Sequence, residues 1–193
     1  AAFIQDLARI QAEAGATYLD VNSGLALYPE EEAEDFAWLV PLIQEAAGLP
    51  LCIDSGRPRP IETALKLHRG EAMINSVNGD PAKMEEIFPL AKKYGSKVIA
   101  LTSSKEGGIP ATSGERLKIA QTIAMEAQNH GVPLGNIYFD PLVMTLSTEH
   151  KNGILFLETL RGIKETLGEA KTISGLSNIS FGLPKRSILN QAF

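Results

Sequence analysis

The chain has 193 residues, of which 44% are hydrophobic and 21% charged, which is enough to form one sizeable hydrophobic core. Its formal net charge of −5, with no run of Lys and Arg interleaved with aromatic residues, argues against nucleic acid or an anionic membrane as a partner. Cys52 is the only cysteine, so an internal disulfide is excluded and a cytoplasmic location is expected, and no apolar run reaches the roughly 18 residues of a membrane-spanning helix.

Short apolar runs that end in a polar residue recur along the chain. In chain order they are "ATYLDVN", "PLCIDS", "AMINSV", "KVIALTS", "NIYFDPLV" and "KTISGLSN", and each is typical of a buried strand. Helical patterns lie between them, with start signals at Pro29, Pro60, Asp80-Pro81, and Thr112 with Glu115 in capping-box spacing. Pro41 is expected to kink or break the helical pattern "FAWLVPLIQEA". Strands that alternate with helices predict an α/β architecture with a parallel sheet.

The spacing of these runs favours one architecture over another. The polar residues at the strand ends recur on average about every 32 residues, and an eight-unit barrel of roughly 250 residues has about 31 per unit. We therefore expect a (β/α)8 TIM barrel, apparently incomplete, with about six βα units. Residues 1–193 are expected to form a single barrel domain that is truncated at both ends. A doubly wound open sheet is the alternative, because six strands would complete it.

Ligands bind at the carboxyl ends of the strands in either architecture. The residues predicted there carry carboxylates, amides and hydroxyls only: Asp20, Asn22, Ser23, Asp54, Ser55, Asn75, Ser76, Thr102, Asp140, Ser177 and Asn178. Cys52 lies within a strand and is interpreted as a buried hydrophobe, and His68 and His130 as residues at helix ends. Lys97 and Lys171 stand where their strands begin, which is the wrong end for a Schiff base.

Three interpretations of these polar strand ends remain open. The carboxylates could hold Mg²⁺, although amides spread over several strands suit an elongated ligand better, and no metal site is expected. Each side chain could simply cap a turn. A pterin ring presents N3–H and a 2-amino group as a two-donor fork, which Asp54 or Asp140 can accept, while the Asn75 amide can serve both the O4 and a ring nitrogen.

Several of these motifs resemble one family. The runs "LPLCIDS", "ALKLHRGEAMINSVNG", "IYFDPLV" and "TISGLSNISFGLPKR" occur in the order in which they are found in the methyltetrahydrofolate:corrinoid/iron–sulfur protein methyltransferases. The folate domain of cobalamin-dependent methionine synthase is a more distant resemblance. The family has a TIM barrel, and the resemblance implies that Asp54, Asn75 and Asp140 bind the pterin, that Asn178 approaches N5, and that Arg186 belongs to the folate site. It also implies a homodimer, methyltetrahydrofolate as substrate, and a partner protein that carries a corrinoid.

The expected function is transfer of the N5-methyl group of methyltetrahydrofolate to the Co(I) of that corrinoid. N5 must gain a proton before it can leave, and the side-chain carbonyl of Asn178 is predicted to stabilise the protonated N5 as the catalytic residue. A dihydropteroate synthase-like enzyme is the alternative, disfavoured because Ser177-Asn178-Ile179 stands where a Ser-Arg-Lys run would be expected. A second alternative is a pterin-binding barrel fragment without catalytic activity.

Overall fold

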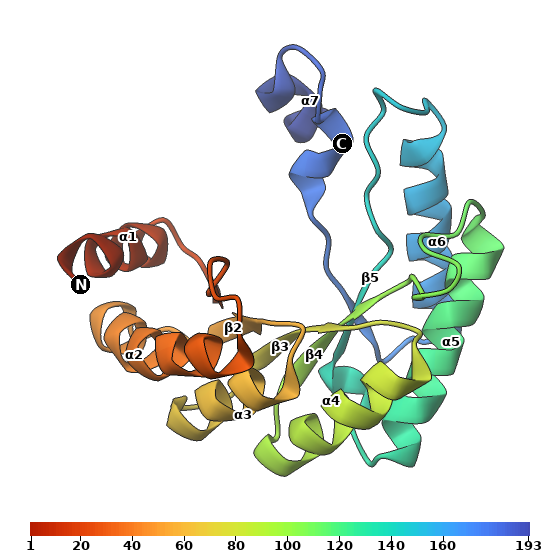
Figure 1. Cartoon of the computed structure of the whole chain (residues 1–193). Coiled ribbons are helices and arrows are strands. Elements are labelled where there is room, and N and C mark those ends of the chain that lie inside the picture. Colours follow the sequence, from red (N-terminus) through yellow and green to blue (C-terminus); the bar gives the residue numbers. More distant parts are fainter. The chain divides into compact units, whose positions relative to one another are not determined.

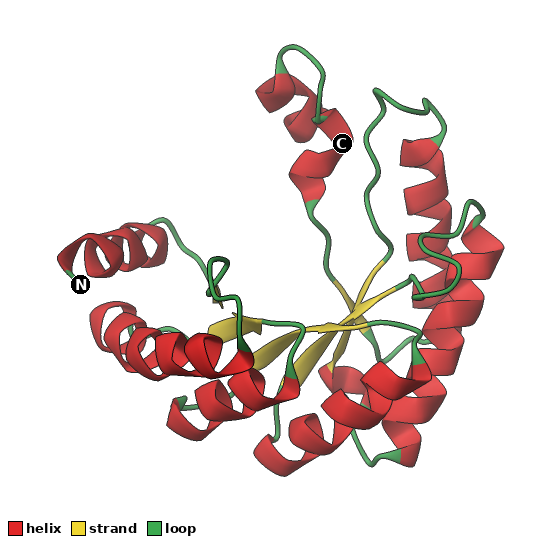
Figure 2. Ribbon diagram, viewed as in Figure 1, coloured by secondary structure: helices red, strands yellow, loops and turns green.

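A computed structural model describes residues 1–193 as six strands that alternate with helices (Figures 1 and 2). The strands are β1 (Leu19–Asn22), β2 (Leu51–Asp54), β3 (Met73–Val77), β4 (Lys97–Leu101), β5 (Ile137–Asp140) and β6 (Lys171–Thr172). The α-helices are α1 (Ala2–Glu13), α2 (Pro29–Ala47), α3 (Pro58–Leu67), α4 (Pro81–Tyr94), α5 (Ser113–Asn129), α6 (Asn152–Thr166) and α7 (Arg186–Ala192), and two 3-10 helices are η1 (Leu134–Asn136) and η2 (Leu176–Ser180).

The strands pair in the order β1-β2-β3-β4-β5-β6, in a six-stranded sheet. The pairs β1–β2, β2–β3 and β5–β6 are parallel. This order never reverses, so the α/β fold with about six consecutive βα units is confirmed and the doubly wound alternative is wrong. The last predicted strand is shorter than expected, because only Lys171–Thr172 pair with β5 and the following residues lead into η2.

The chain divides into two compact units, which we describe separately. The first comprises residues 1–76 and 85–98, and the second residues 77–84 and 99–193. No helix of the chain has both the length and the apolar character needed to cross a membrane.

The core of the first unit forms where α2 and α3 pack on the first three strands. Its fully buried side chains include Phe36, Ile53, Ile61 and Ile74. Helix α2 begins with a proline in its first turn and ends at Gly48, whose φ of 68° is the left-handed conformation that glycine adopts without strain. The helix continues through Pro41 without the break that the sequence allowed.

The core of the second unit contains Ile123 of α5, Phe139 of β5 and Ile163 of α6, all fully buried. Helix α5 begins at the predicted capping box, in which the Glu115 N–H donates to Thr112 Oγ1 over 3.3 Å. Position 79 has no room for a side chain, because a Cβ on Gly79 would lie 2.8 Å from Ile119 Cγ2 and 3.2 Å from the Ser103 carbonyl oxygen. Helix α5 therefore packs closely against the turn that follows β3.

Candidate functional site

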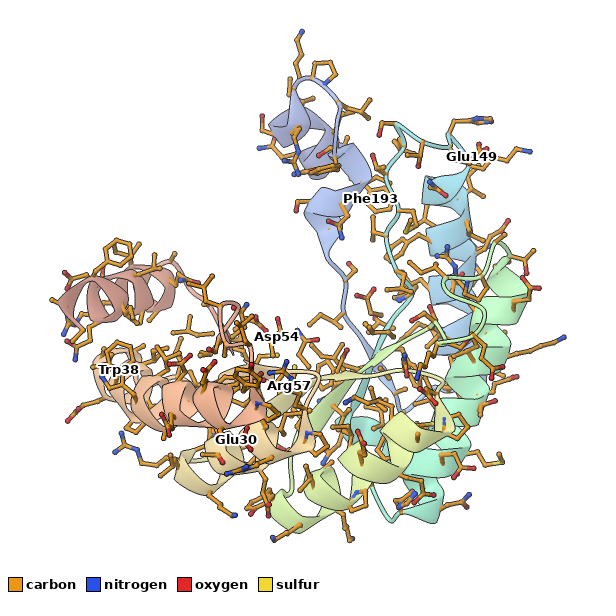
Figure 3. All side chains as sticks on the ribbon, viewed as in Figure 1. Glu30, Trp38, Asp54, Arg57, Glu149 and Phe193 are labelled. Atoms are coloured by element: carbon orange, nitrogen blue, oxygen red, sulfur yellow. The ribbon has the colours of Figure 1, made fainter.

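A row of polar residues crosses the first three strands toward their carboxyl ends. The ladder register aligns Asn22 with Asp54 and Asp54 with Asn75. Residues aligned in a parallel ladder point to the same face of the sheet, so one carboxylate and two amides stand side by side. Asp54 is labelled in Figure 3, and it lines a polar cavity of about 590 Å³ together with Asn22, Ser55 and Arg57.

Asp20 lies on the same face of β1 as Asn22 and next to this row. It lies two residues before Asn22, and its Oδ1 accepts a hydrogen bond from Asn75 Nδ2 over 3.3 Å. Partial burial raises the pKa of Asp54, the negative charges of Asp20 and Glu32 raise it further, and a hydrogen bond from Asn22 opposes the rise. The Asp54 carboxylate is thus poorly compensated in the free protein, and it gains from a ligand that supplies hydrogen-bond donors.

An ion pair between a buried carboxylate and a partly exposed arginine supports the wall of this cavity. Glu32 of α2 is only 7% exposed, and its Oε2 lies 3.1 Å from Arg57 Nη1. Arg57 also donates from Nη2 to the Leu27 carbonyl oxygen over 3.1 Å, which ties the loop between β1 and α2 to the start of α3 (Figure 3). Sequence reasoning did not select Glu32 or Arg57. The proline-rich start of α3 next to the polar end of β2 was the available signal.

In the second unit, Asp140 is the last residue of β5, and both its side chain and its main chain accept hydrogen bonds. Its Oδ1 accepts from the Leu142 N–H over 2.8 Å, and Leu142 has a φ of 63°, which is uncommon for a leucine. The main-chain carbonyl of Asp140 accepts from both the N–H and the Oγ1 of the fully buried Thr102, each over 3.1 Å. Burial raises the pKa of Asp140, while the Leu142 N–H and the Arg116 charge lower it. Its carboxylate therefore has a defined orientation and spare acceptor capacity.

Asn178 and Arg186 lie in the segment that follows β6. Asn178 lies on η2 with an exposed side chain, whose Nδ2 packs so closely on Gly175 that a Cβ there would be 2.9 Å away. Arg186 donates from Nη2 to the Ser177 carbonyl oxygen over 2.9 Å and from Nε to Ser180 Oγ over 3.1 Å. Gly175 thus gives Asn178 room to fold back, and Arg186 ties the η2 segment to the start of α7.

The structure places Asp54 and Asp140 at the carboxyl ends of their strands, Asn75 two residues before the end of β3, and Asn178 and Arg186 after β6. Within the first unit it brings Asp54 and Asn75 together, and within the second it links Asn178 to Arg186 through the η2 backbone. Asp140 lies at the end of β5, with its own hydrogen-bond partners. That all five residues act on one ligand stays a prediction.

The residues set aside from the sequence have structural contacts. Cys52 is buried, and this burial is the main cause that raises its pKa. A hydrogen bond with Asp20 and the negative charge of Asp20 raise it further. His68 Nε2 accepts from the Leu51 N–H over 2.9 Å, and burial lowers its pKa, so it acts as a neutral partner of the strand rather than as a cation at a helix end. Lys171 Nζ lies 3.2 Å from the Tyr138 hydroxyl. No group of three or more His, Cys, Asp or Glu side chains is arranged to hold a metal ion.

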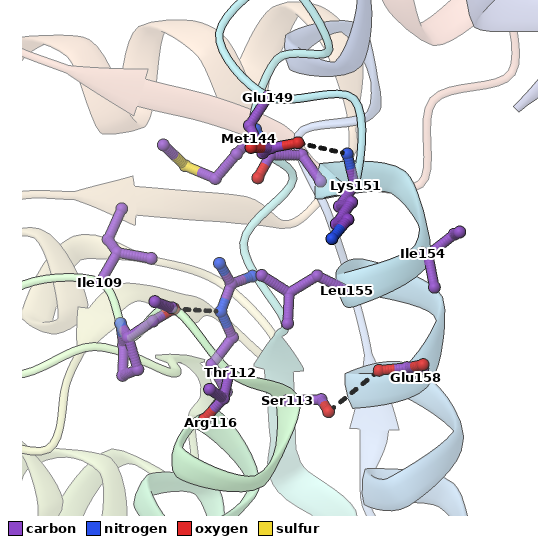
Figure 4. Close-up of a pocket in the computed structure, with 13 residues that line it drawn as sticks. Ile109, Thr112, Ser113, Arg116, Met144, Glu149, Lys151, Ile154, Leu155 and Glu158 are labelled. Atoms are coloured by element: carbon purple, nitrogen blue, oxygen red, sulfur yellow. Dashed lines mark hydrogen bonds between the residues drawn. The ribbon is translucent and has the colours of Figure 1, made fainter.

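A second cavity in the second unit holds none of the predicted residues (Figure 4). It has a volume of about 650 Å³ and lies between the start of α5 and the start of α6. Its wall is largely apolar, with Ile109, Met144 and Leu155 among its residues, and Arg116 reaches it from α5 (Figure 4).

Comparison with known proteins identifies relatives over nearly the whole chain. The family model described as pterin binding enzyme matches residues 3–192. The methylcorrinoid:tetrahydrofolate methyltransferase of Eubacterium limosum is 40% identical over 194 residues, which cover 100% of this chain and 70% of that protein. A methionine synthase of Mycobacterium tuberculosis (strain ATCC 25618 / H37Rv) is 30% identical, and the match covers 97% of this chain but 16% of the synthase.

Solved structures share the fold. A dihydropteroate synthase from Thermus thermophilus superposes with a TM-score of 0.70 at 22% identity, covering 95% of this chain and 72% of the synthase. At that identity the likeness speaks for the architecture alone. It agrees with the incomplete barrel expected from the spacing of the strands.

Proposed function

The chain belongs to the family of pterin-binding enzymes, and from this membership we propose that it catalyses methyl transfer between N5 of tetrahydrofolate and the cobalt of a corrinoid. The observation that carries the proposal is the set of polar strand ends, Asp54, Asn75 and Asp140, in a chain 40% identical to a methylcorrinoid:tetrahydrofolate methyltransferase. The corrinoid is carried by a partner protein, and the enzyme is a cytoplasmic homodimer.

The pterin ring is held by its hydrogen-bonding edge. Asp54 and Asp140 are partly buried carboxylates whose pKa values are raised mainly by burial, so each gains from donors that replace lost water. The N3–H and 2-amino group of the pterin supply two parallel donors to such a carboxylate. Asn75 donates to O4 and accepts from a ring N–H. A heterocycle that lacks these groups leaves buried acceptors unpaired, at a cost of about 1–3 kcal/mol each.

The chemical step needs a proton on N5. In the direction expected from the sequence, the Co(I) nucleophile attacks the methyl carbon, the bond from the methyl group to the protonated N5 breaks, and N5 keeps the bonding electrons as a neutral secondary amine. The products are tetrahydrofolate and a methyl–Co(III) corrinoid. The side-chain carbonyl of Asn178 accepts from the N5–H⁺, and this contact strengthens as the proton arrives. In the reverse direction the same groups serve the same transition state, because the path is shared.

The directions differ in what the protein must bind. From folate to corrinoid, the substrates are methyltetrahydrofolate and Co(I). From corrinoid to folate, which is the order in the name of the Eubacterium limosum relative, they are methyl–Co(III) and tetrahydrofolate. We propose that this chain transfers the methyl group from folate to corrinoid. The opposite direction is the reverse of the same reaction.

The test uses methyltetrahydrofolate with free cob(I)alamin, which replaces the partner protein. We expect loss of the Co(I) absorption and one methyl–cobalt bond formed for each methyltetrahydrofolate consumed, and the reaction of methylcobalamin with tetrahydrofolate is measured beside it. Both reactions are run on this chain. Folate binding without transfer in either direction would leave a pterin-binding protein and contradict the proposed reaction.

A further inference from the structure

Arg116 is a buried cation outside the predicted site. It lies on α5 and is only 2% exposed, which is rare for an arginine. Its Nε donates to the Pro110 carbonyl oxygen over 3.0 Å, and its Nη1 donates to the carbonyl oxygens of Pro141 over 2.7 Å and of Leu142 over 2.9 Å (Figure 4 shows the bond to Pro110). One guanidinium therefore joins the loop after β4 to the two residues that follow Asp140.

Carbonyl partners satisfy the donors of a buried guanidinium but do not neutralise its charge. Burial lowers the pKa of Arg116, which shows that the site penalises the charge, and the negative charge of Asp140 opposes this effect. Conversely, the positive charge of Arg116 lowers the pKa of Asp140. The two charges stabilise each other, and a residue needed only for packing at this position could be apolar at less cost.

The same arginine controls the backbone that orients Asp140. Leu142 has a φ of 63°, and its N–H donates to Asp140 Oδ1 over 2.8 Å. Arg116 binds the carbonyl of Pro141 and that of Leu142, so it holds the peptide group that contains the Leu142 N–H and the peptide group that follows it. Loss of the guanidinium would release this turn and leave three carbonyls without a donor.

We propose that Arg116 is the positioning residue of Asp140: it anchors the turn that orients the carboxylate and supplies the charge that stabilises it for the donor edge of the pterin. This inference rests on the proposed function, because it gives Asp140 the pterin contact. Arg116 acts through Asp140 and does not touch the ligand itself.

A double-mutant cycle tests this role. Arg116→Met, Asp140→Asn and the double variant are compared with the wild type in calorimetric titrations with 5-methyltetrahydrofolate. Arg161→Met, which removes an exposed arginine from α6, is the matched control. We expect Arg116→Met to weaken binding by about tenfold in the wild-type background and by less than about twofold in the Asp140→Asn background, since residues that act as a unit are not additive. Arg161→Met should bind as the wild type does.

A second readout needs no folate. The carboxyl carbon of Asp140 is titrated by NMR in the ligand-free protein, where the groups that lower its pKa are the Leu142 N–H and Arg116. Arg116→Met should raise the pKa of Asp140, so the pH at which binding is lost on acidification also moves upward. Arg116→Lys keeps a positive charge but cannot bridge three carbonyls, and it should give a smaller loss of affinity with the same dependence on Asp140. It replaces Arg116→Met in the calorimetric cycle if that variant does not fold.

The outcomes separate the two proposals. An equal loss of affinity in both backgrounds, or an Asp140 pKa that does not move, would mean that Arg116 only supports the fold and would overturn the inference. A wild-type protein that binds no 5-methyltetrahydrofolate, but in which Arg116→Met still raises the pKa of Asp140, would instead overturn the proposed function and keep the coupling of the two residues.

Discussion

Replacing Asp140 by Asn separates its role in binding from its role in the fold. The amide of Asn keeps one oxygen that can accept from the Leu142 N–H, now 2.8 Å from Oδ1, but it loses the charge and the second acceptor. A charge-assisted contact of this kind contributes about 1.5–3 kcal/mol, so the Kd for 5-methyltetrahydrofolate should rise about 10- to 150-fold.

The stability of this variant should move in the opposite direction. Burial raises the pKa of Asp140 in the folded protein, so the folded state binds a proton more tightly than the unfolded state does. The free energy of unfolding therefore falls as the pH rises through the folded-state pKa, and Asn removes that loss. At pH 7 we expect Asp140→Asn to be as stable as the wild type or more so.

Asp140→Ala is the matched comparison. It loses the same contact with the ligand and also leaves the Leu142 N–H without its acceptor in a left-handed turn. We expect the same rise in Kd with an added loss of about 1–2 kcal/mol in the free energy of unfolding. Titration calorimetry and urea denaturation measure the two quantities. An Asp140→Asn protein that binds 5-methyltetrahydrofolate as tightly as the wild type would refute the assignment of Asp140 to the pterin.

Three further predictions concern other parts of the molecule. Asn178→Ala should lower the single-turnover rate of methyl transfer by about 10²-fold while folate affinity falls much less, and a rate within about twofold of wild type would remove Asn178 from the mechanism. Asp54→Asn should raise the midpoint of thermal unfolding at pH 7, because burial raises the pKa of Asp54 and so disfavours its charged form. The same variant should bind 5-methyltetrahydrofolate more weakly. A lower midpoint would contradict the expected gain in stability. Arg57→Met should cost about 1–2 kcal/mol in urea denaturation, since it leaves the buried Glu32 carboxylate unpaired, and an unchanged midpoint would show that water replaces the arginine.

The sequence alone indicated the six strands and most of the polar residues near their carboxyl ends, and the order of the strands in the sheet then decided between the two architectures. Apolar runs such as "PLCIDS" and the start signals at Pro29 and Thr112 act over a few residues, so they can be interpreted without knowing what lies across the core. The order of the motifs also indicated the family, which the matches to known proteins confirm.

Only the tertiary structure decided which side chains meet. The row of Asn22, Asp54 and Asn75 depends on the register between strands, and the contact of Asn75 with Asp20 joins residues 55 positions apart. The burial of Arg116 follows from the packing of α5 against the loops that come after β4 and β5, and its helical pattern alone indicates an ordinary polar position. Register and burial are set by contacts between segments distant in sequence, and the periodicity within one segment carries no record of them.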